Sequence, residues 1–259
     1  MNRHGILNRE RSRPAVFATA IGAFLALALL PDQTTAQSSS DFLFVSPGVT
    51  LSVYGGYALP GAESDIFDFT TTDLTADRSD FGSLAFGGRL GIRVNEHLDI
   101  ALDLGHSRAE ADTEYREWVD LEDRPIEQTT TFSRTPATLN LEVHPWERGR
   151  SIGRFVWIPR RLSPYVGAGA GLMWYDFTMR GDFVDFETQD IFRSTFESTD
   201  RTLAGQVFAG LDVSISPRFL LDVQVQHVWA STEMDRDFED VDPIDLSGFQ
   251  TTVGIAVRL

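Results

Sequence analysis

The stretch from Leu84 to Gly105, LAFGGRLGIRVNEHLDIALDLG, contains two segments in which apolar side chains occupy every second position. In residues 84–94 the even positions are apolar apart from Gly88, whereas the odd positions are small or carry Arg. Residues 98–104 repeat the pattern, with Leu and Ile alternating against Asp and Ala. Alternation with period two is typical of β-strands that have one apolar face. The stretch therefore predicts an antiparallel hairpin that turns at Asn95-Glu96-His97.

The same alternation recurs along most of the chain, which gives eight predicted strands in all. The last predicted strand runs to Leu259, so its edge needs a partner, and pairing with the first strand supplies one by closing a barrel. The six further strands are predicted at 49–59, 137–143, 165–174, 202–213, 219–226 and 249–259.

The connections between these strands alternate in length. Two are tight turns, at 95–97 and 216–218, whereas four others are long enough to be read as structureless loops. In an up-and-down barrel the long connections then share one end, as in outer-membrane barrels with long external loops. The connection at 144–163 breaks this alternation. The four predicted loops are 60–80, 108–131, 178–200 and 232–246.

The acidic residues are concentrated in the four predicted loops. The 259-residue chain has a formal net charge of −16, and most of its acidic residues lie in the four long segments. A negative chain lacks the basic surface that nucleic acid binding needs, and the absence of Cys excludes disulfides and Cys-ligated zinc. The 144–163 connection is basic, and we expect it either at the rim of a phospholipid leaflet or as an ordinary solvated loop. Its relevant residues are Trp146, Arg148, Arg150, Arg154, Trp157, Arg160 and Arg161.

Residues 1–36 have the organisation of an export signal. Four Arg precede an apolar stretch at 15–30, and Thr34-Thr35-Ala36 places small residues where a signal peptidase cuts. We expect cleavage after Ala36, followed by a short N-terminal segment at 37–47 and a barrel at 48–259. A retained membrane anchor is the alternative. Past residue 36, no apolar run reaches the roughly 18 residues of a membrane helix.

Alternation alone does not say which face of the strands points outward, because a soluble ligand-binding barrel inverts the pattern of a membrane barrel. The non-apolar faces here mix Gly and Ala with charged and amide side chains, which suits the crowded polar lumen of a small membrane barrel. We therefore predict an all-β fold, an eight-stranded antiparallel up-and-down transmembrane β-barrel with long acidic extracellular loops. A soluble secreted barrel is the alternative. Aromatic side chains at the headgroup level are predicted to be Tyr57, Phe81, Phe132, Trp174, Trp229 and Phe249.

The segment from Pro164 to Gly171, PYVGAGAG, completes a resemblance to a known group of proteins. Together with the acidic loops, the signal segment and the apolar-alternating last strand, it resembles the small eight-stranded outer-membrane proteins of Gram-negative bacteria, the OmpA-like, OmpX-like and OmpW-like barrels. The resemblance implies a place in the outer membrane and an encounter with the barrel-assembly machinery. These families usually end in an aromatic residue, whereas this chain ends in Leu259.

A turn centred on Glu96 fixes the register of the 84–105 hairpin. It pairs Arg93 with Asp99 and Arg89 with Asp103, with all four side chains inside the barrel, where an unpaired charge is costly. On the second half of the chain, Asp212 and Asp222 flank the turn at Pro217, and Arg258 is the predicted cation beside them. Two interpretations stay open: a charged constriction that gates small solutes, or a polar plug in a barrel too narrow to conduct.

Enzymatic chemistry has little support in the sequence. His106 with Ser107, or His227 with Ser231, suggests an acyl-transfer site, but alternation places His106 and Ser107 on opposite faces of their strand. We therefore expect no catalytic residues and no enzyme.

The acidic run Asp235, Asp237, Glu239, Asp240 and Asp242 lacks the Gly and Glu that an EF-hand places at its sixth and twelfth positions. We expect neither a dedicated metal site nor a cofactor. Diffuse association of Ca²⁺ or Mg²⁺ is expected instead, bridging acidic loops to lipopolysaccharide phosphates.

These observations favour a structural or interaction role, in which a monomer strengthens the outer membrane and presents its loops to the medium. A narrow channel for small or apolar solutes is the alternative, and a lipid-modifying enzyme is a third. The expected partners are outer-membrane lipids, lipopolysaccharide and, during biogenesis, the assembly machinery.

Overall fold

The computed structural model describes residues 42–120, 122–185, 188–235, 238 and 242–259. The predicted signal segment 1–36 and residues 37–41 lie outside the described residues, as do three of the five acidic residues of the 235–242 run. The described residues belong to one compact unit, Ser38–Leu259. Among them, no helix has the length and apolar character needed to cross a membrane.

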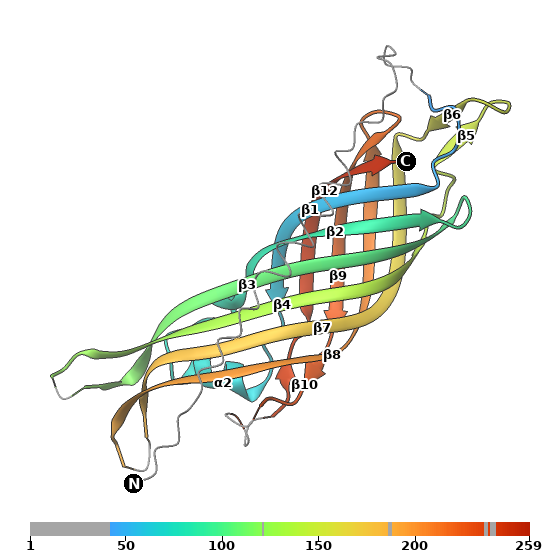
Figure 1. Cartoon of the computed structure of the whole chain (residues 1–259). Helices are drawn as coiled ribbons and strands as arrows, with labels where there is room; N and C mark the ends of the chain where they lie inside the picture. Colours follow the sequence, from blue (N-terminus) through green and yellow to red (C-terminus); the bar gives the residue numbers. More distant parts are fainter. Residues whose placement is uncertain (1–41, 121, 186–187, 236–237, 239–241) are drawn as a thin grey trace, which may run out of the picture. The chain divides into compact units, whose positions relative to one another are not determined.

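Eight antiparallel strands close a barrel in the described part of the chain, which confirms the predicted fold. Around the ring the order is β1, β12, β9, β8, β7, β4, β3 and β2, and β1 pairs with both β2 and β12, so no strand edge is left open (Figure 1). The strands are β1 (Val49–Pro60), β2 (Ser83–Arg93), β3 (Leu98–Val119), β4 (Pro125–Val143), β7 (Leu162–Val184), β8 (Ile191–Ser214), β9 (Phe219–Trp229) and β12 (Gly248–Arg258).

The apolar faces of the strands point outward. Leu139 on β4 is 60% exposed and Ile255 on β12 is 56% exposed, whereas Arg258 on the opposite face of β12 is 3% exposed. An apolar band around a polar interior is the arrangement of a barrel in lipid. It is the inverse of what the soluble alternative requires.

Two of the predicted loops are wrong, because β3 and β4 continue through most of 108–131, and β7 and β8 continue through most of 178–200. Period-two alternation persists there, but the faces exchange character. On β3 the outward positions become charged at Arg108 and Glu110, while the inward positions Ala109 and Tyr115 are buried. Because the prediction rests on the outward apolar phase alone, each predicted strand ends where that phase ends.

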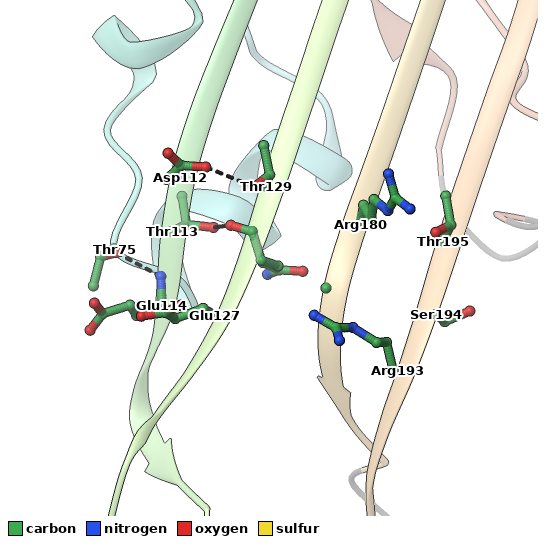
Figure 2. A pocket seen from close by; sticks show the side chains of 12 residues that line it. Thr75, Asp112, Thr113, Glu114, Glu127, Thr129, Arg180, Arg193, Ser194 and Thr195 are labelled. Atoms are coloured by element: carbon green, nitrogen blue, oxygen red, sulfur yellow. Dashed lines mark hydrogen bonds between the residues drawn. The ribbon is translucent and has the colours of Figure 1, made fainter.

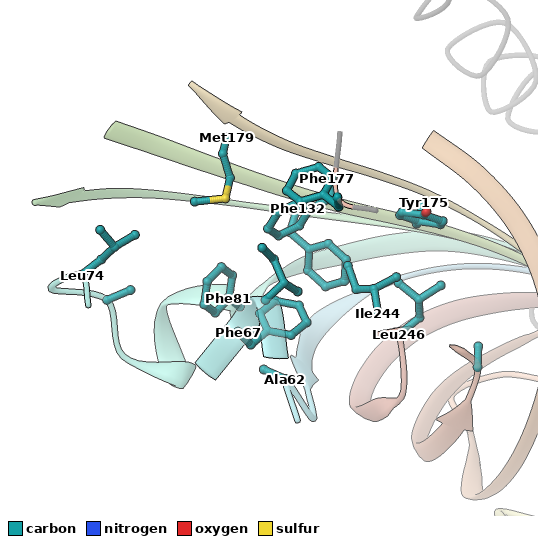
Figure 3. Close-up of a cluster of buried hydrophobic side chains, with 14 of the residues drawn as sticks. Ala62, Phe67, Leu74, Phe81, Phe132, Tyr175, Phe177, Met179, Ile244 and Leu246 are labelled. Atoms are coloured by element: carbon teal, nitrogen blue, oxygen red, sulfur yellow. The ribbon is translucent and has the colours of Figure 1, made fainter. Parts of the chain in front are cut away.

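The inner faces of these long hairpins carry a second hydrophobic core outside the apolar band. Residues 61–82 contribute α2 (Asp65–Thr72) and the 3₁₀ helix η1 (Arg78–Phe81), and the described residues of 230–247 contribute β10 (Ser231–Thr232) and β11 (Ile244–Asp245). We call these two segments with the hairpin ends the cap. Figure 3 shows its buried side chains between the helix and the strands.

Phe67 on α2 lies at the centre of the cap. Its ring centroid is 4.9 Å from that of Phe81, 5.4 Å from that of Phe132 and 6.0 Å from that of Phe177. The predicted headgroup positions of Phe81 and Phe132 are therefore wrong, because both side chains turn inward into the cap. Among the other predicted headgroup residues, Tyr57, Trp229 and Phe249 are between 45% and 58% exposed.

The opposite end, which we call the short-turn end, is covered by the 144–161 connection. It forms a two-stranded sheet of β5 (Gly149–Ser151) and β6 (Trp157–Pro159). Trp157 is buried, and its backbone exchanges hydrogen bonds of 2.7 and 2.8 Å with Leu43. A leaflet position is therefore wrong for Trp157 and Arg148, which turn inward, whereas Trp146 is 54% exposed.

Candidate functional site: the lumen network and the hairpin cleft

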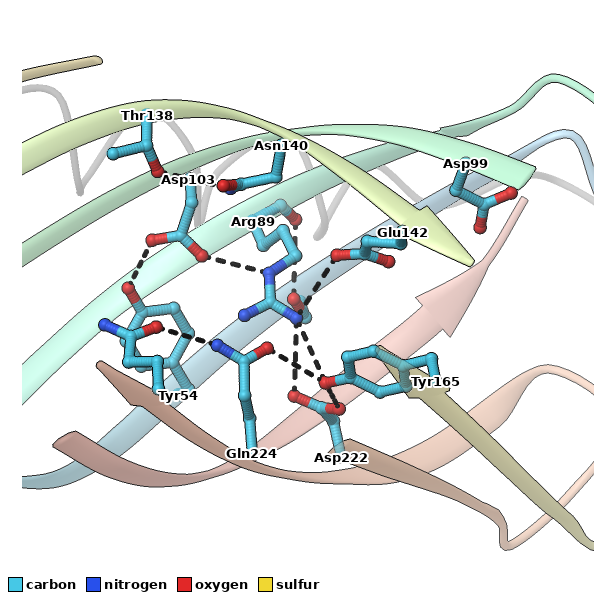
Figure 4. A network of polar contacts seen from close by, with 12 residues as sticks. Tyr54, Arg89, Asp99, Asp103, Thr138, Asn140, Glu142, Tyr165, Asp222 and Gln224 are labelled. Atoms are coloured by element: carbon cyan, nitrogen blue, oxygen red, sulfur yellow. Dashed lines mark hydrogen bonds and ion pairs between the residues drawn. The ribbon is translucent and has the colours of Figure 1, made fainter. Parts of the chain in front are cut away.

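The guanidinium group of Arg89 lies at the centre of a buried ionic network inside the barrel. Its Nε is 2.9 Å from Asp103 Oδ2, and its Nη1 is 3.6 Å from Glu142 Oε1 and 3.7 Å from Asp222 Oδ1. The four side chains come from β2, β3, β4 and β9, so the network joins opposite walls of the barrel (Figure 4). The predicted pair Arg89–Asp103 is present.

Two tyrosines complete this lumen network. Tyr54 donates a 2.6 Å hydrogen bond to Asp103 Oδ1, and Tyr165 donates a 2.5 Å hydrogen bond to Asp222 Oδ2. Arg89 Nη1 also donates to Tyr165 Oη at 3.3 Å. Hydrogen bonds to ionised partners are the stronger kind, and each additional one offsets part of the cost of burying charge.

Glycines on the inward faces make room for these tyrosines. A Cβ at position 87 would lie 2.4 Å from Tyr54 Oη, and a Cβ at position 210 would lie 2.3 Å from Tyr165 Cζ. Gly87 and Gly210 lie on the non-apolar, inward phase of the strands predicted at 84–94 and 202–213, but alternation alone predicts no role for them. The signal for this packing is a Gly that pairs, on the neighbouring strand, with an inward-facing Tyr.

At the short-turn end the ion pairs differ from those predicted. Arg93 and Asp99 are register partners, but Asp99 is paired with Arg148, whose Nη2 donates to Asp99 Oδ1 at 2.8 Å. Arg93 instead donates to Ser46 Oγ and lies 5.6 Å from the ring centroid of Trp157. The predicted ion pair is wrong because the 144–161 connection brings Arg148 to Asp99.

The predicted role of Arg258 is present for Asp212, with which Arg258 interacts electrostatically, but not for Asp222. The Arg258 guanidinium lies 5.6 Å from the Trp157 ring centroid and donates to the carbonyl of Pro217. Asp222 is paired with Arg89. Asp212 on β8 and Asp222 on β9 are register partners. Trp157 therefore attracts both Arg93 and Arg258 through its ring face.

Two small cavities lie in the lumen of the described strands. Their volumes are about 30 Å³ beside the lumen network and about 10 Å³ beneath the cap. Arg134 reaches from β4 to donate a 2.8 Å hydrogen bond to the carbonyl of Leu246 in the cap. The apolar cluster of the cap continues onto inward-facing Met173 and Val228 of the barrel wall.

The candidate acyl-transfer residues are not assembled. His106 is half-buried on the outer face, where its Nδ1 is 2.8 Å from Thr135 Oγ1, whereas Ser107 is buried inside. The His227 ring contacts the rings of Trp229 and Phe249, with both centroid distances 4.4 Å.

A polar cleft of about 1050 Å³ opens where the β3–β4 and β7–β8 hairpins diverge, and we call it the hairpin cleft. The pairing of β4 with β7 ends at Gln128 and Gly181. One side carries Glu114 and Glu127, and the other carries Arg193 with Arg180 (Figure 2). The sequence pattern does not predict this cleft, because the residues of both hairpin ends are predicted to be loops.

A comparison with models of protein families agrees with this architecture. The family model described as outer membrane protein beta-barrel domain matches residues 22–256. No curated protein matches the chain.

Three similar solved structures are Neisserial surface protein A, Ail of Yersinia pestis and OprG of Pseudomonas aeruginosa. The first is 12% identical and covers 86% of this chain and 100% of its own, with a TM-score of 0.44. Ail is 12% identical over 83% of this chain and 100% of its own, with a TM-score of 0.45. OprG is 14% identical over 84% and 99%, with a TM-score of 0.43.

Proposed function

Because the chain belongs to the family of outer membrane protein beta-barrel domains, we propose that this outer-membrane protein is a closed barrel that holds a folded cap at the cell surface. Its role is then structural and interaction-based. The observation that carries the proposal is the exchange of apolar and polar faces along the long hairpins, because a core of buried Phe side chains outside the apolar band has no use in a simple pore.

The lumen network supports closure. Opening a path for solutes requires breaking contacts between Arg89 and carboxylates from three other strands, as well as lifting Trp157 and Arg148 from the short-turn end. Each buried charge left without a partner costs several kcal/mol, about 3–5 by analogy with buried ion pairs. The narrow-channel alternative needs that rearrangement, and the plug interpretation does not.

Planar bilayer conductance tests this proposal. The wild-type protein is expected to be silent at all voltages, and Arg89→Ala is expected to stay silent because the cap still covers the barrel. Steady wild-type conductance that changes in Arg89→Ala or Arg93→Ala would instead favour the channel.

The outward charges next to the apolar band suggest how the barrel meets its lipids. Arg108 on β3 and Arg201 on β8 are the first charged outward residues beyond that band, and both are exposed. Arg at this level suits lipid phosphates, and Arg108 also pairs with Glu110 at 3.5 Å. Asp176 beyond the band is proposed to need a bridging Ca²⁺ or Mg²⁺ against the same phosphates. The protein is thus proposed to bind lipopolysaccharide as a monomer, after insertion by the barrel-assembly machinery.

Thermal unfolding in lipopolysaccharide compared with phospholipid vesicles checks the lipid contact. We expect lipopolysaccharide with Mg²⁺ to raise the unfolding temperature of the wild type, and the double variant Arg108→Gln/Arg201→Gln to lose most of that increase.

We also propose that the protein is not an enzyme, and unchanged lipid species after deletion of its gene would agree with this.

A further inference from the structure

Three buried ligand atoms meet at the short-turn end of the lumen. Asp99, Glu142 and His144 each offer one such atom, and these atoms all lie within 4.8 Å of one another. Asp99 comes from the start of β3, Glu142 lies on β4, and His144 follows β4 directly. All three residues are less than 9% exposed. A cluster of this kind needs independent support before it indicates a ligand.

The hydrogen bonding of His144 provides that support. Both ring nitrogens are buried, and neither has a hydrogen-bond partner, which is unusual for buried polar groups. Nε2 lies 3.8 Å from Asp99 Oδ2, too far for a hydrogen bond but within the separation of two ligands that share an ion at about 2.0–2.2 Å. Glu142 Oε1 is also buried without a hydrogen bond, and it faces the guanidinium of Arg89 at 3.6 Å.

Space and charge at this place both suit a cation. The three residues line the cavity of about 30 Å³, which is large enough for a water-sized occupant. Its lining includes four carboxylates, from Asp99, Glu142, Asp212 and Asp222, against two guanidinium groups, from Arg89 and Arg148. If the nearby Asp103, Arg93 and Arg258 are added, carboxylates still outnumber guanidinium groups.

From this geometry we propose that Asp99, Glu142 and His144 bind one divalent transition metal ion inside the lumen. Imidazole together with carboxylate oxygens suits Zn²⁺ and similar ions, whereas Mg²⁺ and Ca²⁺ prefer oxygen ligands alone. Arg148 donates to both oxygens of the Asp99 carboxylate, through Nη1 to Oδ2 and through Nη2 to Oδ1, but a carboxylate has about four lone-pair sites and accepts several partners at once. The ion joins β3 and β4 to the connection that covers the short-turn end. This site departs from the expectation that the chain holds no metal.

The proposal is tested with untagged, full-length mature protein refolded in detergent in the presence of Zn²⁺, followed by equilibrium dialysis and metal analysis. We expect one retained Zn²⁺ per chain, no retained Mg²⁺, and a higher unfolding temperature with Zn²⁺ than without it. His144→Ala and Glu142→Gln should each weaken Zn²⁺ binding by about tenfold or more. The matched control His106→Ala removes a histidine from the outer face of β3 and should bind like the wild type.

Retention of Zn²⁺ by His144→Ala at the wild-type level would overturn the proposal, because the ion would then reside on the acidic cap. Wild-type protein that retains no Zn²⁺ would overturn it equally. If the His144→Ala variant does not refold, its Zn²⁺ retention is replaced as the test by the absorption spectra of Co²⁺-loaded wild-type and Glu142→Gln proteins. A nitrogen-and-oxygen ligand set that Glu142→Gln alters supports the site, and a spectrum unaffected by Glu142→Gln contradicts it.

Discussion

Arg89 and Asp103 face each other across β2 and β3, with Nε 2.9 Å from Oδ2, and the structure surrounds this pair with two further carboxylates. One cation thus serves three anions that are all shielded from solvent. The stability of the barrel should depend on this cation far more than on any surface pair.

Arg89→Met should lower the free energy of unfolding by about 3–5 kcal/mol, because it leaves buried carboxylates without their cation. Arg78→Met is the matched control, since Arg78 pairs with Asp68 at 3.0 Å on the surface, with both side chains more than half exposed. It should cost at most about 1 kcal/mol. Urea unfolding in detergent, followed by tryptophan fluorescence, measures both. Equal losses in the two variants would mean that the lumen network contributes no more than a surface pair.

Gly210→Ala should destabilise the barrel by about 1–3 kcal/mol, because the added methyl group meets the Tyr165 ring. Gly205→Ala on the same strand is the control, since a Cβ there meets nothing within 4 Å. Combining Gly210→Ala with Tyr165→Ala should cost less than the sum of the two single losses. Strictly additive losses would show that the two positions do not touch.

Period-two alternation in the sequence was sufficient to predict the eight strands, and the turn centred on Glu96 gave the register of the 84–105 hairpin. The outward direction of the apolar face followed from the Gly, Ala and charged residues of the opposite faces. It could not predict the cap, because the apolar phase moves from the outer to the inner face near His106 and Trp174, and alternation carries no mark of that change. Nor could alternation predict that Arg148, and not Arg93, forms the ion pair with Asp99. That contact depends on the path of the 144–161 connection, which no short-range pattern fixes.

Phe67→Ala should loosen the cap by about 3–5 kcal/mol while leaving the barrel intact, because Phe67 packs only against cap residues among the ring contacts described. Limited proteolysis should then cut within residues 61–82, and the heat-modifiable gel mobility of the barrel should not change. Thr72→Ala, an exposed change on the same helix, should resist proteolysis like the wild type. Loss of the barrel in Phe67→Ala would mean that cap and barrel fold as one unit.

Tyr115 should make the cap less stable at alkaline pH. Burial of its side chain raises its pKa above the ordinary value of 10. The unfolded cap therefore loses this proton at lower pH than the folded cap. The stabilisation is complete below pH 10, and it is lost as the pH rises through the raised pKa.

Proteolysis of the cap should accordingly accelerate above pH 10. Tyr115→Phe, which has no ionisable hydroxyl, should reduce that acceleration. If Tyr115→Phe has the pH dependence of the wild type, ionisation of Tyr115 does not destabilise the cap.

The most direct measurement of the central claim is the environment of outward-facing positions along a single long strand. The chain has no Cys, so nitroxide labels can be placed singly on β8, at Val207→Cys within the apolar band and at Thr195→Cys beyond it. In lipid vesicles, the label at position 207 should be accessible to oxygen and the label at position 195 to a water-soluble nickel complex. Equal accessibility of the two labels to the nickel complex would contradict a barrel that carries its hairpins from lipid into water.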